Sequence, residues 1–180
     1  SVNIKKDDNI LIEILGEEAI PLAKELIKKA EKLGAKPQFN IINYEILRVM
    51  LENATEEQIK MYGKIDSDRM KKMDAYIGIR ATSNTSELNS IPKEKMDLYN
   101  KYYTLPVHFE ERVKNTKWCI LRYPNNSMAQ MSKINKDEFE DFFFNVCNLD
   151  YNNMSKSMDS LKYLMNKTDK VLILGNGTDL

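Results

Sequence analysis

The hydrophobic pattern at the start of the chain predicts a strand followed by a helix. Residues 9–15, NILIEIL, form a nearly continuous apolar run, which is typical of a strand that is covered on both faces. From residue 19 to 33 the apolar positions recur at helical spacing, with Pro21 in the expected first turn and Gly34 just beyond the expected end. Together these segments predict one β-α unit.

The alternation of strand and helix continues along the chain. Further strands are predicted at residues 37–43, 74–79, 117–123 and 171–174. Helices are predicted near residues 45–52, from residue 55 to about 72, from residue 92 onward, near 125–132, from residue 135 onward and from about 151 to 167. Parallel neighbouring strands need long crossover connections, which helices supply. The order therefore predicts an α/β fold: a mostly parallel, Rossmann-like sheet of about five strands with helices on both faces.

Local signals add detail to this arrangement. Thr55 and Gln58 have the spacing of a capping box at a helix N-terminus. Pro106 lies inside a helical stretch, where a proline is expected to break or kink the helix. The second strand is more polar than the first, which favours a position nearer the edge of the sheet.

Length and composition favour one soluble domain over residues 1–180. The chain has 42% hydrophobic and 30% charged residues, ordinary values for a globular protein. Lys plus Arg and Asp plus Glu are equal at 27 each, so neither nucleic acid nor a membrane is expected as a partner. No apolar run approaches the roughly 20 residues of a membrane span. Because there is no secretory signal and Cys119 and Cys147 are expected in the core, the sequence favours a cytoplasmic protein.

A glycine turn near the end of the chain partly matches a nucleotide-binding motif. Gly175 and Gly177 match the first two glycines of G-x-G-x-x-G, but Leu180 stands where the third belongs. In a dinucleotide site, the helix after the glycines presents its amides to the pyrophosphate. The first strand, where this motif normally follows, is followed by Gly16 and two glutamates that would repel phosphate. A plain tight turn is therefore favoured over a nucleotide site.

The side chains that could bind a metal do not form a recognisable motif. His108 is the only histidine, and it is interpreted as a structural or surface residue. The acidic run Asp137–Asp141 is the charged face of a helix whose other face is apolar, so a solvated helix face is favoured over a carboxylate metal site. No residue of this chain is assigned as a metal ligand.

Nucleophilic catalysis has no candidate either. There is no G-x-S-x-G motif, and Cys119 lies inside a predicted strand, where core packing is favoured over catalysis. Met154, Met158 and Met165 recur at helical spacing and are interpreted as a core stripe. No catalytic residue is assigned, and the substrate-binding residues are left unknown.

Two long stretches resemble a known family. They are WCILRYPNNSMAQM at residues 118–131 and the segment from DEFEDFFF to GNGTDL at residues 137–180. The pattern combines Tyr123-Pro124 with Met128-Ala129-Gln130, continues through the Cys147–Tyr151 cluster, and ends in the glycine turn before Thr178-Asp179-Leu180. It resembles the N-terminal half of the thermophilic metalloaminopeptidases of the aminopeptidase T and aminopeptidase S type. The beginning of the chain is similar through generic α/β features, and residues 44–116 match only loosely.

The resemblance implies a two-domain hydrolase that removes N-terminal amino acids from peptides with two divalent metal ions, Zn, Co or Mn. The family's glutamate, histidine, tyrosine and aspartate ligands lie in the C-terminal domain, so none is carried onto this chain. Residues 1–180 are then expected to be the noncatalytic N-terminal part, inactive alone, with the catalytic metal-binding domain absent and GNGTDL leading toward it. The expected partners are the protein's own C-terminal catalytic domain and the peptide substrate, with a homodimer as a further option.

The expected role of this part is to shape the cleft and to limit access by long peptides. Ligands usually contact the loops at the carboxyl ends of parallel strands, which points to Arg80–Asn84 and Arg122–Asn126, with a solvated turn as the alternative for each. Two other functions stay open: a free-standing module that binds a small molecule or nucleotide, and an interaction or dimerisation domain.

Overall fold

The computed structural model describes residues 2–179, and the chain divides into two compact units after Glu140. The first unit holds the whole parallel sheet and the helices packed on it. The expectation of one domain over residues 1–180 stays a prediction. None of the helices in residues 2–179 is long and apolar enough to span a membrane.

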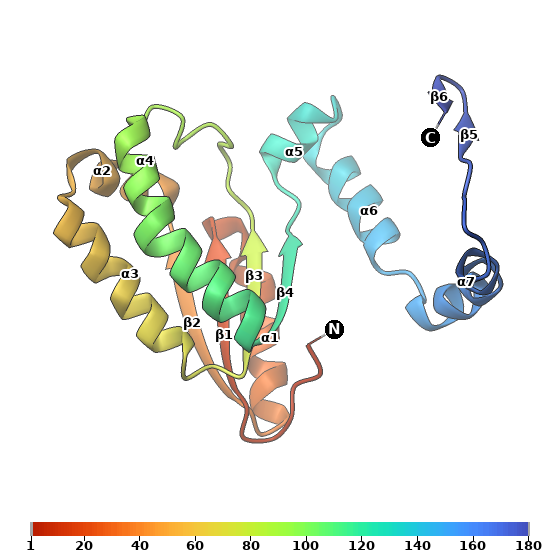
Figure 1. The fold of residues 1–180 in the computed structure, drawn as a ribbon, viewed down its shortest axis with the longest axis horizontal. Helices are drawn as coiled ribbons and strands as arrows, with labels where there is room; N and C mark the ends of the chain where they lie inside the picture. Colours follow the sequence, from red (N-terminus) through yellow and green to blue (C-terminus); the bar gives the residue numbers. More distant parts are fainter. Residues whose placement is uncertain (1, 180) are drawn as a thin grey trace. The chain divides into compact units, whose positions relative to one another are not determined.

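Four parallel strands form the sheet in the order β2-β1-β3-β4 (Figure 1). They are β1 (Asn9–Leu15), β2 (Lys36–Ile42), β3 (Ala75–Arg80) and β4 (Lys117–Arg122). The central strand β1 is buried along its middle, as its apolar run predicts, whereas the more polar β2 lies at the edge. The register places Leu15 beside Ile42 and Arg80, and Arg80 beside Arg122, so the four strands end together.

Helices cover both faces of the sheet, which confirms the predicted α/β class. On one face, α1 (Ile20–Lys32), preceded by the short 3-10 helix η1 (Glu17–Ala19), packs Ala23 and Ala30 against the even-numbered residues of β1. On the other face, α3 (Glu56–Met70) and η2 (Asn100–Val113) lie side by side (Figure 1) and pack against Leu11 and Tyr76. A third cluster joins α2 (Tyr44–Asn53) to α4 (Lys93–Tyr99).

The start of α3 and its contact with η2 follow from two local features. The predicted capping box is confirmed, because Gln58 N–H donates to the Thr55 hydroxyl over 3.2 Å and Thr55 N–H donates to the Gln58 side chain over 3.3 Å. In the middle of α3, Gly63 lets the two helices meet backbone to backbone. A Cβ at this position would lie 1.8 Å from the carbonyl oxygen of Tyr102, so only glycine fits.

The helix is not broken at Pro106, although a break or a kink was expected there. After Asn100 the chain continues as a π-helix through Pro106 to Val113. Proline has no N–H to donate and its ring crowds the preceding turn. The wider π-helical turn is one of the known ways in which a helix accommodates such a disruption.

The fifth strand of the sheet was predicted wrongly. Residues 171–173 have no regular structure, and β5 (Leu174–Gly175) pairs in antiparallel fashion with β6 (Thr178–Asp179) instead of joining the parallel sheet. The glycine turn gives Leu174 a partner five residues away, Asp179, so a local hairpin replaces the long-range pairing. This outcome agrees with the plain tight turn for Gly175–Gly177, while Leu180 lies outside the described residues.

The helices at the end of the chain have the predicted positions but not all of the predicted burial. They are α5 (Asn126–Met131), α6 (Lys136–Cys147) and α7 (Tyr151–Asn166). Met154, Met158 and Met165 of α7 are exposed, so the core stripe predicted there is wrong for the described chain, and Cys147 is exposed as well. The periodicity was that of an amphipathic helix, but residues 141–179 supply no second apolar layer that buries its stripe.

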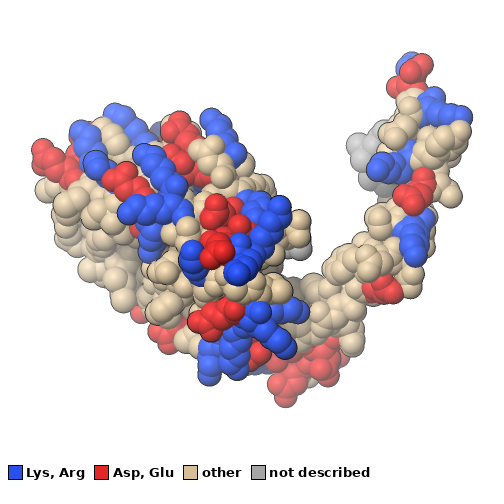
Figure 2. Space-filling view, turned by 90° about the horizontal axis from the view of Figure 1, so that it is seen from below, with Lys and Arg blue, Asp and Glu red and all other residues tan. Residues whose placement is uncertain are grey.

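Charged side chains of both signs are mixed on the surface. Figure 2 shows Lys and Arg interspersed with Asp and Glu over the face seen from below. This mixture agrees with the equal totals of 27 basic and 27 acidic residues. That face therefore carries no large field of a single sign.

Candidate functional site

A polar cleft lies at the carboxyl ends of β1, β2 and β3. It has a volume of about 350 Å³ and is lined by the three loops that follow these strands. Glu17 comes from η1, which follows β1, Tyr44 comes from the start of α2, and Thr82 and Asn84 come from the loop after β3. In open parallel sheets this edge is the usual place for ligands.

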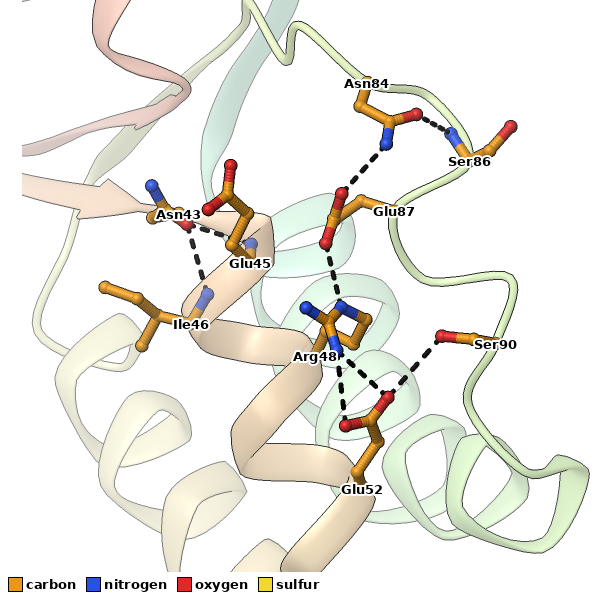
Figure 3. Close-up of polar contacts among 9 residues, drawn as sticks. All are labelled: Asn43, Glu45, Ile46, Arg48, Glu52, Asn84, Ser86, Glu87 and Ser90. Carbon is orange, nitrogen blue, oxygen red and sulfur yellow. Dashed lines mark hydrogen bonds and ion pairs between the residues drawn. The ribbon is translucent and has the colours of Figure 1, made fainter.

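The α2 side of the cleft is fixed by an N-cap. Asn43 Oδ1 accepts hydrogen bonds from the N–H groups of Glu45, at 2.9 Å, and Ile46, at 3.1 Å (Figure 3). Asn43 thereby satisfies two amides that the helix itself leaves free. This cap holds Tyr44 and Glu45 at the wall of the cleft.

The loop after β3 is tied to α2 by a network of charged and amide side chains (Figure 3). Arg48 Nε donates to Glu87 Oε1 over 2.8 Å, and its Nη1 donates to Glu52 over 3.2 Å. Glu87 Oε2 accepts from Asn84 Nδ2 at 2.9 Å, and Asn84 Oδ1 accepts from the N–H of Ser86 at 3.0 Å. The hydrogen bond from Arg48 keeps the pKa of the Glu87 carboxyl below its ordinary value. The network therefore presents Glu87 as a carboxylate at the rim of the cleft.

The charge of this cleft is negative. Four glutamates contribute to its wall: Glu17, Glu18, Glu45 and Glu87. Of these, Glu87 has a cationic partner in Arg48. A cleft with such a lining attracts cationic groups such as a protonated amine.

A second cavity adjoins the cleft and shares Tyr44 with it. Its volume is about 200 Å³. One face of the sheet forms the floor, with Glu13, Gly78 and Arg80, and η2 contributes His108 and Arg112. Gly78 has no side chain, and the Tyr76 side chain occupies the space beside it, because a Cβ at this position would lie 2.7 Å from the Tyr76 hydroxyl.

A buried ion pair lies at the base of this second cavity. Arg112 Nη1 lies 3.0 Å from Glu13 Oε1, and Arg112 Nη2 donates to Glu13 Oε2 over 3.0 Å. The Tyr76 hydroxyl donates to Glu13 Oε1 over 2.8 Å, and Asn40 Nδ2 donates to Oε2 over 3.0 Å. The Arg112 guanidinium also stacks over the Tyr76 ring, 4.4 Å from its centroid. Both oxygens of Glu13 are thus satisfied, and its charge is balanced by Arg112.

His108 is half-buried in the wall of this cavity, which agrees with a structural role. Burial lowers the pKa of its imidazole, and the positive charges of Arg112 and Arg80 lower it further. Since the ordinary histidine pKa is about 6.5, the ring is neutral at neutral pH. A neutral imidazole can donate one hydrogen bond and accept another.

The described residues do not fit a metal centre. Within residues 2–179 no group of three or more His, Cys, Asp or Glu side chains is arranged to hold an ion. The charged groups that act on His108 are two arginines and a single carboxylate, Glu13, which is already paired with Arg112. No step of metal chemistry is derived from this chain, and the location of the family's ligands in another domain stays a prediction.

The structure separates the two loops that the sequence analysis singled out. Thr82 and Asn84 line the cleft, and Arg80 lines the second cavity. Among the described residues, those from 122 to 126 line neither of these two cavities. Buried Asn125 instead ties the loops together, since its Nδ2 donates to the Thr82 carbonyl over 2.9 Å.

The second cavity was missed by the sequence analysis, although one signal for it was present. Glu13 interrupts an otherwise apolar run in the central strand, and a buried charge in such a place requires a partner. The partner, Arg112, lies 99 residues away, and no local pattern identifies it.

Comparisons with known proteins identify the family. The comparison with curated proteins gives no significant match. Among solved structures, the chain is similar to wild-type AmpT from Thermus thermophilus, with 20% sequence identity and a TM-score of 0.49. That similarity covers 69% of this chain and 33% of the AmpT chain. The profile of the thermophilic metalloprotease family (M29) matches residues 1–179, which shows that the chain belongs to this family.

Proposed function

We propose that this chain is the noncatalytic N-terminal part of a metallo-aminopeptidase that hydrolyses N-terminal amino acids from peptides. The observation that carries the proposal is the match to the metalloprotease family over residues 1–179. In this proposal a C-terminal catalytic domain binds the two divalent ions, Zn, Co or Mn, and provides their ligands. The chain itself supplies the face that the peptide passes on its way to them.

The cleft at the carboxyl edge of the sheet supports this role. A peptide that is cut from its N-terminus carries a protonated α-amino group, and the wall of the cleft carries glutamates. The loop of Glu87 is held by Arg48, so this carboxylate keeps its place without being ordered by the ligand. The cleft would then align peptides by their amino ends and restrict long ones.

The remaining partners belong to the same proposal. They are the chain's own catalytic domain, the peptide substrate and a second copy in a homodimer. The proposed location is the cytoplasm. Cys119 and Cys147 are free thiols, which is ordinary for a cytoplasmic protein. The alternative is a free-standing module for small-molecule binding or dimerisation, and the adjoining cavity of about 200 Å³ favours binding over dimerisation.

Metal stoichiometry tests the proposal. The 180-residue chain and the product of the same gene extended through its downstream region are each loaded with Co²⁺, dialysed and analysed for bound metal. We expect about two ions per extended chain and none retained by the 180-residue chain, because the described residues form no ligand cluster. Retention of two ions by the 180-residue chain would overturn the proposal, and so would an extended protein that retains none.

A further inference from the structure

We propose that the second cavity binds the α-carboxylate of a short peptide, with Arg80 as its charged partner. The role of this peptide as a substrate rests on the proposed function, but its binding does not.

Arg80 supplies the unbalanced charge of the cavity. Glu13 and Arg112 neutralise each other in the buried ion pair. In the described part of the chain, the Arg80 guanidinium forms no ion pair, although it lies at the mouth of a cavity. Its charge acts on groups in the wall: it lowers the pKa of His108, and it opposes the rise that burial causes in the pKa of Tyr44. The cavity therefore has a net positive charge and favours an anion.

The geometry of the site favours a carboxylate as that anion. Arginine presents a planar fork of N–H donors that matches the two oxygens of a carboxylate. Arg80 stands at the end of β3, on the same face as Tyr76 and Gly78, so the backbone of a central strand holds its base in place. Neutral His108 and the hydroxyl of Tyr44 add hydrogen-bonding groups to the same wall.

The neighbouring cleft narrows the ligand class to zwitterions. The cleft and the second cavity share Tyr44, and they have opposite charge. Glutamates line the cleft, and Arg80 gives the second cavity its positive charge. A short peptide carries an ammonium group at one end and a carboxylate at the other. At roughly 3.3–3.6 Å per extended residue, a dipeptide or tripeptide separates these charges far more than a free amino acid does. A volume of about 200 Å³ suits one amino acid side chain with its carboxylate rather than a large ligand, which needs roughly 300 Å³ or more.

Calorimetry on the 180-residue chain tests the proposal without any hydrolysis. The probes are Ala-Leu, Ala-Leu amide, leucine and inorganic phosphate. We expect saturable binding of Ala-Leu, and at least about tenfold weaker binding of its amide, because the amide cannot form the charge-assisted pair with Arg80. If leucine binds as tightly as Ala-Leu, the site recognises free amino acids instead of peptides, and the proposal of a peptide ligand is overturned.

Matched arginine variants locate the site. Arg80→Gln is expected to weaken Ala-Leu binding by about tenfold and to abolish the difference between the acid and the amide. Arg122→Gln is the control, since Arg122 is the register partner of Arg80 on β4 but does not line the cavity, and it should bind as the wild type does. Circular dichroism confirms that each variant is folded. Equal affinity for acid and amide, equal losses in both variants, binding of phosphate alone, or no binding by the folded chain would each overturn the proposal.

Discussion

Single residues decide the chemistry of this molecule because a few charges are placed where water cannot reach them. Glu13 is buried in the central strand, and it accepts hydrogen bonds from three side chains that come from three different elements. A buried carboxylate of this kind is tolerated only when each lone pair finds a donor. The pair with Arg112 therefore fixes the position of η2 against the sheet.

Removal of one partner of this pair should be strongly destabilising. Arg112→Leu leaves Glu13 buried without its counter-charge, and we expect a loss of about 3–5 kcal/mol in the free energy of unfolding by urea denaturation. The exposed pair Lys28–Glu25 is the control, since Lys28→Ala should leave the free energy of unfolding nearly unchanged. A loss of less than about 1 kcal/mol for Arg112→Leu would contradict the account. The double variant Glu13→Leu with Arg112→Leu should recover part of the loss.

The lowered pKa of His108 predicts a pH dependence of stability. In the unfolded chain the histidine binds its proton with a pKa near 6.5, and the folded state binds it more weakly. The contribution is therefore fully present above about pH 6.5 and is lost as the pH falls through the folded pKa. The charged groups that act on the ring are Arg112, Arg80 and Glu13.

Thermal unfolding between pH 7 and pH 5 measures this effect. We expect the wild type to lose more stability over this range than His108→Gln does, because glutamine does not titrate. Parallel curves for the two proteins would show that His108 does not contribute to the pH dependence.

At the scale of elements, close contact between two helices shapes the cavity. α3 and η2 meet at Gly63, where the backbone of Tyr102 occupies the space of a side chain. Tyr103, next in the chain, stacks on Tyr62 of α3 with ring centroids 4.9 Å apart and donates to buried Asp66 over 2.8 Å. The packing of the two helices thus holds the aromatic wall above the sheet.

Gly63→Ala should separate these helices. The added methyl group meets the Tyr102 carbonyl, which belongs to a backbone and cannot rotate away, so we expect a loss of about 1–3 kcal/mol or more in stability. Lys64→Ala, on the exposed side of the same helix, removes only the exposed ion pair with Asp68 and should leave the stability nearly unchanged. Equal midpoints of urea unfolding for the two variants would contradict the close contact.

The elements also show which features the sequence could predict. The four strands of the sheet and the capped start of α3 were predicted because periodicity and capping are local signals. The prediction of a fifth strand in the sheet was wrong because an apolar run does not reveal which strand it pairs with. Leu174 pairs across the glycine turn with Asp179. The predicted burial of α7 was wrong for the same reason, since periodicity identifies an apolar face but not the layer that covers it.

For the site, the loop at Arg80–Asn84 was predicted from topology, whereas the pairing of Glu13 with Arg112 depends on long-range packing.

At the scale of the whole molecule, the chain is an α/β scaffold of a metalloprotease family whose described residues form no metal-ligand cluster. Its distinctive surface is the carboxyl edge of the sheet, where a cleft lined by glutamates adjoins a cavity lined by Arg80. These two charges suit the two ends of a short peptide. We propose that this scaffold guides peptides and that the hydrolytic centre lies in a different part of the protein.

The most direct test is hydrolysis of leucine p-nitroanilide by equimolar amounts of the 180-residue chain and of the protein extended through its downstream region, both loaded with Co²⁺. We predict metal-dependent turnover by the extended protein that EDTA abolishes, and no turnover by the 180-residue chain. Turnover by the purified 180-residue chain, or an inactive extended protein, would contradict the proposed location of the hydrolytic centre.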